Sequence, residues 1–492
     1  MYVLGVDFGG GASKATLMDR FGKVIKTATS EYPTDFGDGG RAEQDPRDWY
    51  LAAVKNIRQV LDGVSPTLVD CLCFDAATHT AVLLGEDGEP VCKSVYWTDT
   101  RCLAEKAYLE EHFSDEIFEK CKHRVDTIWS LPEIMFIKNC FPAVFARVSR
   151  VTFAKDYVRG KFTGDFVTDR IEAEGSMLFD YDRRDWDEGL LSLAGLKRSM
   201  MPRITEPLST VGTVSETAAR DTGLLAGTRV ICGATDTAME VLAAGAIHQG
   251  DVTIKLATAG RICVISDRFY PDRNVVNYSH LLDGLTYPGA ATKACAASLR
   301  WFRDTFGGEY SDFDRMASEV PIGCDGLIYN PHLMGELTPY ADPTMRASFI
   351  GFGAQHTKAH FARAVMEGVA MSLLDCRNYM NDRGICLGER AFIIGGGAKS
   401  ALWRQIVADA LGITLVLTER NDSSLGSCMC AGVAVGYFES LADAVAHTQR
   451  IVDETHPVRE HTEIYGRQFE KYKKIGKFLS ALNKSNEDRS TT

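Results

Sequence analysis

Two short hairpins of similar design open the two halves of this chain, and they constrain its architecture more than any other feature. Residues 2–19 contain an apolar run that ends in Asp7, a glycine turn at Gly9–Gly11 and a returning strand. Residues 251–265 repeat the order of strand, small-residue turn and strand. Turns of small residues let backbone N–H groups approach an anion closely. The repetition predicts two related α/β halves that meet near residues 245–250, each with a hairpin suited to phosphate oxygens.

A second strand that ends in a carboxylate lies in the middle of the chain. The apolar run Val230–Cys232 leads into a turn at residues 233–236, and a helix of small residues is expected from Thr237 to about residue 245. Asp236 is thereby expected at the carboxyl end of a strand, where open α/β sheets bind their ligands. A lone aspartate at such a place is more often a helix N-cap or a turn aspartate. Its neighbours in the fold therefore decide whether Asp236 is reactive.

Length, charge and cysteine usage narrow the class of protein. A chain of 492 residues exceeds one hydrophobic core, so two or three domains are expected. No run of about 18 apolar residues and no secretion signal is visible, which favours a cytoplasmic protein without a membrane partner. The net charge of −12 disfavours a nucleic-acid partner. The 14 cysteines include no CxxC pair, so reduced, mostly buried thiols are expected rather than a metal centre.

Strands and helices alternate through both halves, which predicts α/β layers. A helix is expected over residues 46–61, with Asp45 as its cap, and another over residues 292–306. Near the end of the second half, a strand at residues 390–394 runs into the triplet Gly395, Gly396 and Gly397 and then into a helix at 401–411. Glycines between a strand and a helix allow a nucleotide to lie against the helix N-terminus.

Several longer segments resemble one known family. They are YWTDTRC at 96–102, KDYVRGKFTGDFVTD at 155–169, PHLMGELTP at 331–339, ARAVMEGVA at 362–370 and GGGAKSALWRQIVADALG at 395–412. The chain is similar from Tyr2 to about Lys477 to the FGGY family of ATP-dependent carbohydrate kinases, and within it to the xylulokinase branch.

The resemblance implies the two-domain fold that sugar kinases share with actin and the Hsp70 ATPase, a ribonuclease H-like α/β fold with a central cleft. The expected boundaries are a sugar-binding domain at 1–245, a nucleotide-binding domain at 246–482 and a polar, frayed tail at 483–492. ATP and Mg²⁺ are the expected cofactors, and a small sugar is the expected partner. Homodimers are common among such kinases, so a homodimer is a further expectation.

The resemblance also implies a role for individual residues. Asp236 matches the catalytic base, and Asp7 matches the acid that holds Mg²⁺ with Asp236 nearby. The remaining residues fall into three groups: Gly9, Gly10, Gly11, Thr258 and Gly260 at the phosphates, Gly395, Gly396, Gly397 and Lys399 at the nucleotide, and Thr78, His79 and Thr237 at the sugar. These roles suit phosphoryl transfer, which needs a positioned hydroxyl, a base, Mg²⁺ and donors for spread negative charge.

The chain departs from the xylulokinase pattern at several of these places. It has Ala77-Thr78-His79 for Gln-Met-His, Thr237 for Asn or Gln, and glycines where the first hairpin usually carries hydroxyls. A lost polar group can change sugar specificity strongly. The resemblance to the xylulokinase branch makes phosphorylation of D-xylulose the expected reaction. The alternatives are ribulose, another ketose, gluconate or a sugar alcohol, or a kinase-derived sensor.

Five of these residues also have purely structural interpretations. His79 could be a satisfied core histidine, and Asp99 with Arg101 could be a helix N-cap with an ion pair. Lys155 and Asp156 are expected to be structural.

Overall fold

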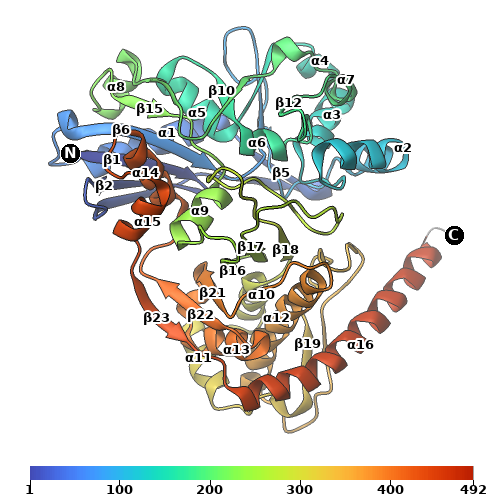
Figure 1. The fold of residues 1–492 in the computed structure, drawn as a ribbon. Coiled ribbons are helices and arrows are strands. Elements are labelled where there is room, and N and C mark those ends of the chain that lie inside the picture. Colours follow the sequence, from blue (N-terminus) through green and yellow to red (C-terminus); the bar gives the residue numbers. More distant parts are fainter. Residues whose placement is uncertain (491–492) are drawn as a thin grey trace. The chain divides into compact units, whose positions relative to one another are not determined.

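The computed structural model describes residues 1–490 and divides into two compact units (Figure 1). Unit 1 comprises Met1–Gly245, Tyr278–Asp283 and Arg420–Gln449. Unit 2 comprises Ala246–Asn277, Gly284–Glu419 and the chain from Arg450 onward. Two contiguous sequence ranges therefore do not describe the units, because two later segments of the chain pack with the first one.

Unit 1 has a main sheet of six strands, in the order β14-β15-β6-β1-β2-β3, and several smaller sheets. Its strands are β1 (Tyr2–Phe8), β2 (Ala12–Asp19), β3 (Val24–Glu31), β4 (Asp35–Gly37), β5 (Arg41–Gln44), β6 (Val69–Ala76), β7 (Ala81–Leu84), β8 (Ser94–Val95), β9 (Arg150–Phe153), β10 (Val167–Asp169), β11 (Phe179–Asp180), β12 (Asp185–Trp186), β13 (Arg203–Thr205), β14 (Thr210–Thr213) and β15 (Arg229–Ile231). Its helices are α1 (Pro46–Leu61), α2 (Leu103–Cys121), α3 (Ser130–Cys140), α4 (Pro142–Phe145), α5 (Ala154–Thr163), α6 (Arg170–Gly175), α7 (Glu188–Ala194), α8 (Glu216–Thr222), α9 (Asp236–Ala244), α14 (Ser423–Ala434) and α15 (Leu441–Thr448).

Unit 2 has a main sheet of six strands, in the order β18-β17-β16-β21-β22-β23, and a small sheet of two strands. Its strands are β16 (Val252–Leu256), β17 (Gly260–Val264), β18 (Gly289–Thr292), β19 (Ile328–Asn330), β20 (Ser348–Ile350), β21 (Arg390–Ile394), β22 (Thr414–Thr418) and β23 (Ile451–Thr455). Its helices are α10 (Ala296–Phe306), α11 (Tyr310–Ser318), α12 (Lys358–Asn381), α13 (Ala401–Leu411) and α16 (Arg459–Ser490).

The two sheets share one pairing pattern. From β3 to β14, successive neighbours pair antiparallel, antiparallel, parallel, parallel and antiparallel. From β18 to β23 the sequence of pairings is the same. The repeat that the two hairpins predict thus extends to the whole of both sheets, and the α/β class is confirmed.

Helices cover both faces of the unit 1 sheet because side chains alternate along β1. Leu4, Val6 and Phe8 point to one face, where they join a buried cluster that includes Trp49 of α1 and Tyr157 of α5. Gly5 points to the other face, where a Cβ atom would lie 2.1 Å from the carbonyl oxygen of Ser424 in α14. Helix α14, more than 400 residues later in the chain, therefore packs directly on β1 and completes the first unit.

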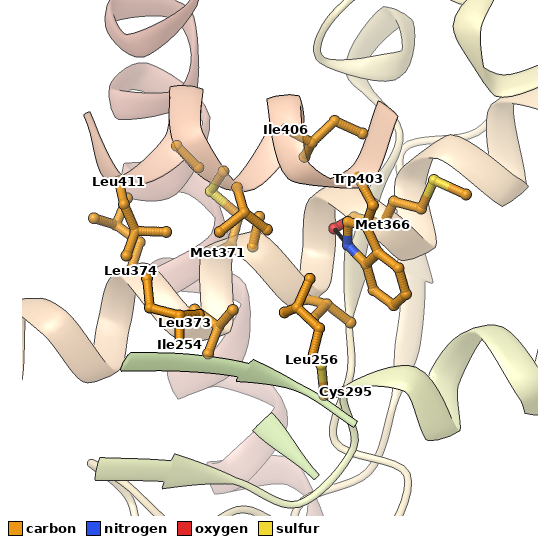
Figure 2. Close-up of a cluster of buried hydrophobic side chains, with 14 of the residues drawn as sticks. Ile254, Leu256, Cys295, Met366, Met371, Leu373, Leu374, Trp403, Ile406 and Leu411 are labelled. Carbon is orange, nitrogen blue, oxygen red and sulfur yellow. Dashed lines mark hydrogen bonds between the residues drawn. The ribbon is translucent and has the colours of Figure 1, made fainter. Parts of the chain in front are cut away.

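The core of unit 2 lies between its sheet and the helices α12 and α13 (Figure 2). Ile254 and Leu256 of β16 face Leu373 and Met371 of α12, and Trp403 of α13 closes the end of the layer. The indole Nε1 of Trp403 donates a hydrogen bond to the carbonyl oxygen of Met366 at 3.2 Å. This buried polar tie fixes α13 against α12, and with it the glycine turn that precedes α13.

Most predicted elements lie where the sequence places them, but three differ. The helix expected from residue 292 begins at Ala296, because Gly289–Thr292 pairs with β17 as strand β18. The sequence also predicts a helix over residues 101–113, whereas α2 begins at Leu103 and continues to Cys121. Helix α16 runs to Ser490 through most of the tail expected to be frayed, and residues 491–492 lie outside the described part.

Most of the cysteine side chains are buried. All 14 cysteines are free thiols, and only Cys140 and Cys386 are exposed. Of the helices that the structure describes, none is long and apolar enough to cross a membrane.

Candidate active site

Three carboxylates lie at one edge of the unit 1 sheet. Asp7 of β1 and Asp75 of β6 are direct partners across parallel strands. Thr235 forms a parallel bridge with Ala76, which brings the start of α9, and so Asp236, to the same edge. The carboxyl ends of parallel strands are where open α/β sheets bind ligands. Strand pairing thus brings Asp7, Asp75 and Asp236, which are far apart in the sequence, to one edge of the sheet.

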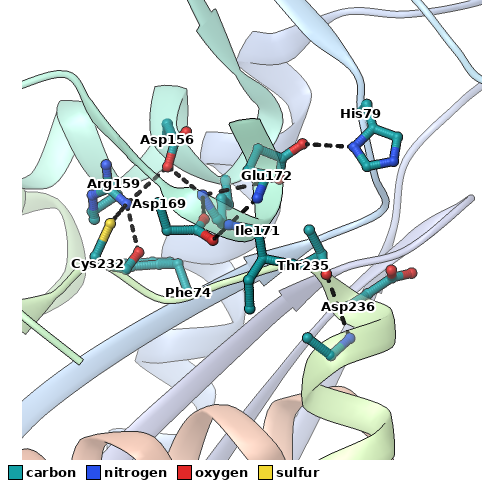
Figure 3. Close-up of polar contacts among 12 residues, drawn as sticks. Phe74, His79, Asp156, Arg159, Asp169, Ile171, Glu172, Cys232, Thr235 and Asp236 are labelled. Atoms are coloured by element: carbon teal, nitrogen blue, oxygen red, sulfur yellow. Dashed lines mark hydrogen bonds and ion pairs between the residues drawn. The ribbon is translucent and has the colours of Figure 1, made fainter. Parts of the chain in front are cut away.

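Asp236 is the first residue of α9 and not its cap (Figure 3). Thr235 caps the helix, since its hydroxyl oxygen accepts a hydrogen bond from the amide of Ala238. Oδ1 of Asp236 accepts from both the amide and the hydroxyl of Thr237, at 2.6 and 3.2 Å. The N-cap alternative for Asp236 is therefore wrong. The helix N-terminus favours a negative charge at this position, and Thr237 fixes the direction of the carboxylate.

Asp7 and Asp75 are neighbouring buried acids, and the pKa of each is raised. Burial raises the pKa of the Asp7 carboxyl to about 7, and the nearby charge of Asp236 adds to this effect. Burial and the charge of Asp7 hold the pKa of Asp75 well above its usual range. The hydroxyl of Ser427 in α14 donates to Oδ2 of Asp75 at 2.5 Å. Two acids this close favour a cation or a proton between them.

The donor set at this edge suits a hard cation with few protein ligands. Oδ1 of Asp7 and Oδ1 of Asp75 are buried and accept no hydrogen bond from a described residue. Within residues 1–490, no three His, Cys, Asp or Glu side chains converge as a metal centre. Mg²⁺ typically takes one or two carboxylates and fills its other positions with water and phosphate oxygens. The residues present therefore fit Mg²⁺ that is bound together with a phosphate ligand.

The glycine hairpin between β1 and β2 is fixed by its carbonyl groups. The carbonyl oxygen of Gly10 accepts from Nε2 of Gln44, and the carbonyl oxygen of Gly11 accepts from the amide of Tyr32. The amides of Gly10 and Gly11 make no hydrogen bond to a described residue. Both residues are exposed, and a Cβ atom on Gly11 would meet nothing within 4 Å. The hairpin thus presents backbone N–H donors to solvent, as an anion-binding turn requires.

His79 lies just beyond the end of β6, in the buried interior of unit 1, beside the half-buried Thr78. Its Nε2 atom is 2.7 Å from the hydroxyl of Tyr278. Figure 3 shows its other ring nitrogen, Nδ1, facing Oε1 of Glu172, at 3.6 Å. The rings of Trp129 and Tyr278 lie 5.2 and 5.6 Å from the imidazole. The structural interpretation of His79 is therefore partly right, because its ring already has protein partners.

A buried group of charges lies behind His79. Nζ of Lys155 is 2.6 Å from Asp156, 2.6 Å from Asp169 and 3.9 Å from Glu172. Arg159 pairs with Asp156 at 2.8 Å and donates to the carbonyl oxygen of Cys232, in the segment that leads to Asp236. Lys155 and Asp156 are structural, as expected, and they connect the surroundings of His79 with those of Asp236.

The second hairpin, in unit 2, is clipped to the start of α10. The carbonyl oxygen of Thr258 accepts from the amides of Cys295 and Ala297, at 3.0 and 3.3 Å, while the residue itself is exposed. Gly260 is buried, and a Cβ atom there would lie 2.8 Å from Cγ2 of Thr292. Gly260 is thus required by packing, whereas Thr258 faces solvent and is open to a ligand.

The three glycines after β21 have different environments. Gly395 has φ +91°, and a Cβ atom would lie 2.6 Å from the carbonyl oxygen of Leu256. A Cβ atom on Gly397 would lie 2.9 Å from Cβ of Leu256, whereas Gly396 is exposed with nothing within 4 Å. The turn thus lies against the end of β16 and the backbone of Ala257, with the exposed Lys399 following it. In unit 2 the fold brings the predicted phosphate and nucleotide residues together at one sheet edge.

Sequence reasoning missed Asp75, Glu172, Tyr278 and Ser427. Asp75 follows an apolar run just as Asp7 does, so the same pattern could have found it. Tyr278 and Ser427 reach unit 1 from distant parts of the chain and carry no local signal. The structural interpretation of Asp99 and Arg101 is half right. Asp99 is not a helix cap, because α2 begins at Leu103, but it does form the expected ion pair with Arg101 and also accepts from the amide of Ala42.

Comparison with known proteins places this geometry in a family. Residues 2–243 match the N-terminal domain of the FGGY family of carbohydrate kinases, and residues 274–435 match its C-terminal domain. The chain is 30% identical to the xylulose kinase of Bacillus subtilis (strain 168), over 98% of both chains. It is 25% identical to the gluconokinase of the same organism, over 91% of both chains.

A solved structure shows the same fold. The crystal structure of ligand-bound xylulose kinase from Lactobacillus acidophilus superimposes with a TM-score of 0.92, at 24% identity, over 98% of this chain and 99% of that one. The two-domain α/β fold of sugar kinases is thereby confirmed. The chain belongs to the FGGY family of carbohydrate kinases and is an ATP-dependent sugar kinase.

Proposed function

We propose that this kinase phosphorylates a ketopentose, with D-xylulose converted to D-xylulose 5-phosphate. The observation that carries the proposal is the 30% identity to a xylulose kinase over 98% of both chains. A second candidate is an aldonate such as gluconate, which the similarity to a gluconokinase favours. Both substrates have a hydroxyl that can accept the γ-phosphoryl group. The reaction is therefore the same for both, and only the contacts with the sugar differ.

Asp236 is the proposed general base. Its position at the first turn of α9 favours the charged form, and Thr237 directs its carboxylate. In this role the carboxylate takes the proton of the attacking hydroxyl as the γ-phosphoryl group is transferred. A positioned base of this kind contributes on the order of 10² to 10⁴ in rate.

The remaining residues bind and orient the ligands in the proposal. In unit 1 the free amides of Gly10 and Gly11 receive phosphate oxygens, and in unit 2 Thr258 has the same role. Gly396 and Lys399 receive the nucleotide, and the half-buried Gly395 and Gly397, with the buried Gly260, shape the backbone around it. Thr78, His79 and Thr237 surround the sugar.

Mg²⁺ is the proposed cofactor, held by Asp7 with Asp75 and Asp236 nearby. When bound, it neutralises charge on the phosphate groups. The buried and unbonded Oδ1 atoms of Asp7 and Asp75 support this assignment. Hydrogen bonds from Ser427 and Thr237 hold the carboxylates of Asp75 and Asp236, respectively, in place.

The test is ADP release with Mg-ATP across ketopentoses, ketohexoses, polyols and aldonates, beside Asp236→Ala. A ketopentose is expected to stimulate turnover most, and the variant is expected to lose about 10² to 10⁴ in kcat. Asp182→Ala, an exposed carboxylate in the same unit, is the matched control and is expected to keep full activity. Preferential turnover of gluconate would replace the substrate and leave the base assignment intact. Full activity of Asp236→Ala would remove the base assignment.

A further inference from the structure

The hydroxyl of Tyr278 occupies one of the two ring nitrogens through which His79 could bind a sugar. Nε2 of His79 and Oη of Tyr278 are 2.7 Å apart, and both residues are almost fully buried, with 3% and 6% of their surface exposed. The other nitrogen, Nδ1, faces Glu172 at 3.6 Å. Glu172 is itself buried, 3.9 Å from Nζ of Lys155, so Nδ1 faces a buried carboxylate of the unit's interior. Nε2 is therefore the nitrogen at which a protein partner can be exchanged for a substrate hydroxyl.

The imidazole of His79 is itself held in place. A Cβ atom at Gly175 would lie 1.5 Å from Cε1 of His79, so the ring lies flat against the backbone of α6. The hydroxyl of Ser130 donates to the carbonyl oxygen of His79, and the ring of Trp129 lies 5.2 Å away. Reorientation of His79 would require movement of several buried groups. The partner that moves on ligand binding is then Tyr278.

The segment that carries Tyr278 is short and is bounded by the other unit. Tyr278–Asp283 belongs to unit 1, whereas Asn277 before it and Gly284 after it belong to unit 2. One carboxylate anchors this segment: Oε2 of Glu174 accepts from the amide of Ser279 at 2.9 Å, and Oε1 accepts from its hydroxyl at 2.6 Å. Arg170 lies 3.3 Å from the same carboxylate. Glu174 of α6 thus positions Tyr278 next to His79 by binding Ser279, the residue that follows Tyr278.

We propose that the Tyr278 hydroxyl is an internal competitor for the sugar hydroxyl at Nε2 of His79, and that it thereby determines substrate specificity. The inference rests on the proposed role of His79 in sugar binding. A sugar with a hydroxyl at that position replaces the lost hydrogen bond. A sugar without one leaves the His79–Tyr278 hydrogen bond in place and finds part of the site filled. The net strength of one hydrogen bond between neutral groups sets the size of the effect, about 2- to 10-fold in affinity.

The decisive variant is Tyr278→Phe, which keeps the ring and removes the competing hydroxyl. Sugar affinity is measured by calorimetry without nucleotide, and KM and kcat by ADP release. The dissociation constant and KM for the preferred sugar are expected to fall about 2- to 10-fold, with kcat changed less than about 2-fold. The deoxy analogue that lacks the His79-bound hydroxyl is expected to gain nothing. A purely structural role would not separate the sugar from its deoxy analogue.

A matched control is Tyr50→Phe, which removes a tyrosine hydroxyl that donates to Asp221 at 2.6 Å elsewhere in unit 1. It is expected to leave the sugar dissociation constant unchanged. Ser279→Ala supplies a second variant, because it removes one of the two bonds from Glu174 and loosens Tyr278. It is expected to strengthen sugar binding in the same direction as Tyr278→Phe, and it keeps the proposal testable if that variant does not fold.

The alternative outcomes each have one meaning. Weaker sugar binding by a folded Tyr278→Phe protein overturns the proposal and makes the hydroxyl a direct sugar ligand. Unchanged binding of every sugar also overturns it. If the wild-type enzyme itself turns over no sugar in the panel, the proposed function fails, which is a result distinct from either of these.

Discussion

Nζ of Lys155 lies 2.6 Å from Oδ2 of Asp169, and neither side chain exposes any surface to solvent. Asp169 also caps α6, since its Oδ1 accepts from the amides of Ile171 and Glu172 (Figure 3). One carboxylate therefore fixes both the lysine and the start of the helix that supports His79 through Gly175. A buried ion pair of this kind is costly to break, because the remaining charge has no water to solvate it.

We predict that Lys155→Met lowers the free energy of unfolding of unit 1 by about 3–5 kcal/mol, because it leaves the buried carboxylates of Asp169 and Glu172 without their lysine partner. Adding Asp169→Asn to that variant is expected to cost less than Asp169→Asn costs alone, because the charge it removes is already unpaired. Urea unfolding of the three variants and the wild type measures the coupling. Arg315→Gln, which breaks an exposed pair in α11, is the control and is expected to cost less than about 1 kcal/mol. A cost below about 1 kcal/mol for Lys155→Met would contradict the argument.

The sequence predicts local structure well where local signals are strong. Strand β21 and helices α1 and α13 have the predicted bounds, and Asp45 caps α1 with Pro46 in its first turn. Apolar periodicity, a cap and a glycine turn act within a few residues, so no tertiary information is needed for them. The carboxylates Asp7 and Asp236 are identifiable for the same reason, because each follows a buried strand.

The rest of the site depends on contacts between distant segments. Gly5 matters because α14 crosses it, and Tyr278 matters because Glu174 holds its neighbour Ser279. Neither relation leaves a periodic or compositional trace in the chain. The cap assigned to Asp99 is wrong for a related reason, since its carboxylate is taken by the amide of Ala42, 57 residues earlier. Long-range hydrogen bonds of this kind override local propensity.

We predict that Glu133→Gln stabilises the protein at neutral pH. Glu133 of α3 is 3% exposed, and its Oε1 accepts no hydrogen bond from a described residue. Burial holds the pKa of Glu133 well above its ordinary value, and the charge of Asp99 adds to this. Ionising this side chain in the folded state therefore costs free energy that the unfolded state does not pay. Stability is retained below the unfolded pKa, near 4.3, and is lost as the pH rises toward the folded one.

The measurement is urea unfolding of Glu133→Gln and wild type between pH 5 and 8. The stability difference is expected to grow with pH and to reach about 1–3 kcal/mol in favour of the variant. Glu110→Gln, which removes an exposed carboxylate from α2, is expected to change stability by less than about 0.5 kcal/mol. A difference that shrinks as the pH rises has the wrong sign for this explanation.

We predict that Gly175→Ala weakens sugar binding more than 10-fold and lowers stability by about 1–3 kcal/mol, because the new methyl group displaces the His79 ring. Gly466→Ala in α16 is the matched control: it is also a helical glycine, but a Cβ atom there would meet nothing within 4 Å. Helix propensity alone would make both substitutions stabilising by about 1 kcal/mol. Calorimetry with the preferred sugar and thermal unfolding separate the two effects. Normal sugar binding by Gly175→Ala would mean that His79 tolerates movement.

We predict that Gly395 and Gly396 respond oppositely to alanine. Gly395→Ala forces a side chain into a conformation with φ +91° and against the carbonyl oxygen of Leu256, so stability is expected to fall by about 1–3 kcal/mol. Gly396→Ala meets no protein atom, so its stability is expected to stay within about 0.5 kcal/mol of wild type. If the nucleotide lies over Gly396, the same methyl group raises the KM for ATP several-fold while the KM for sugar is unchanged. Thermal unfolding and ATP titrations of both variants distinguish a glycine that shapes the turn from one that faces the ligand. An unchanged KM for ATP in Gly396→Ala would move the nucleotide away from this turn.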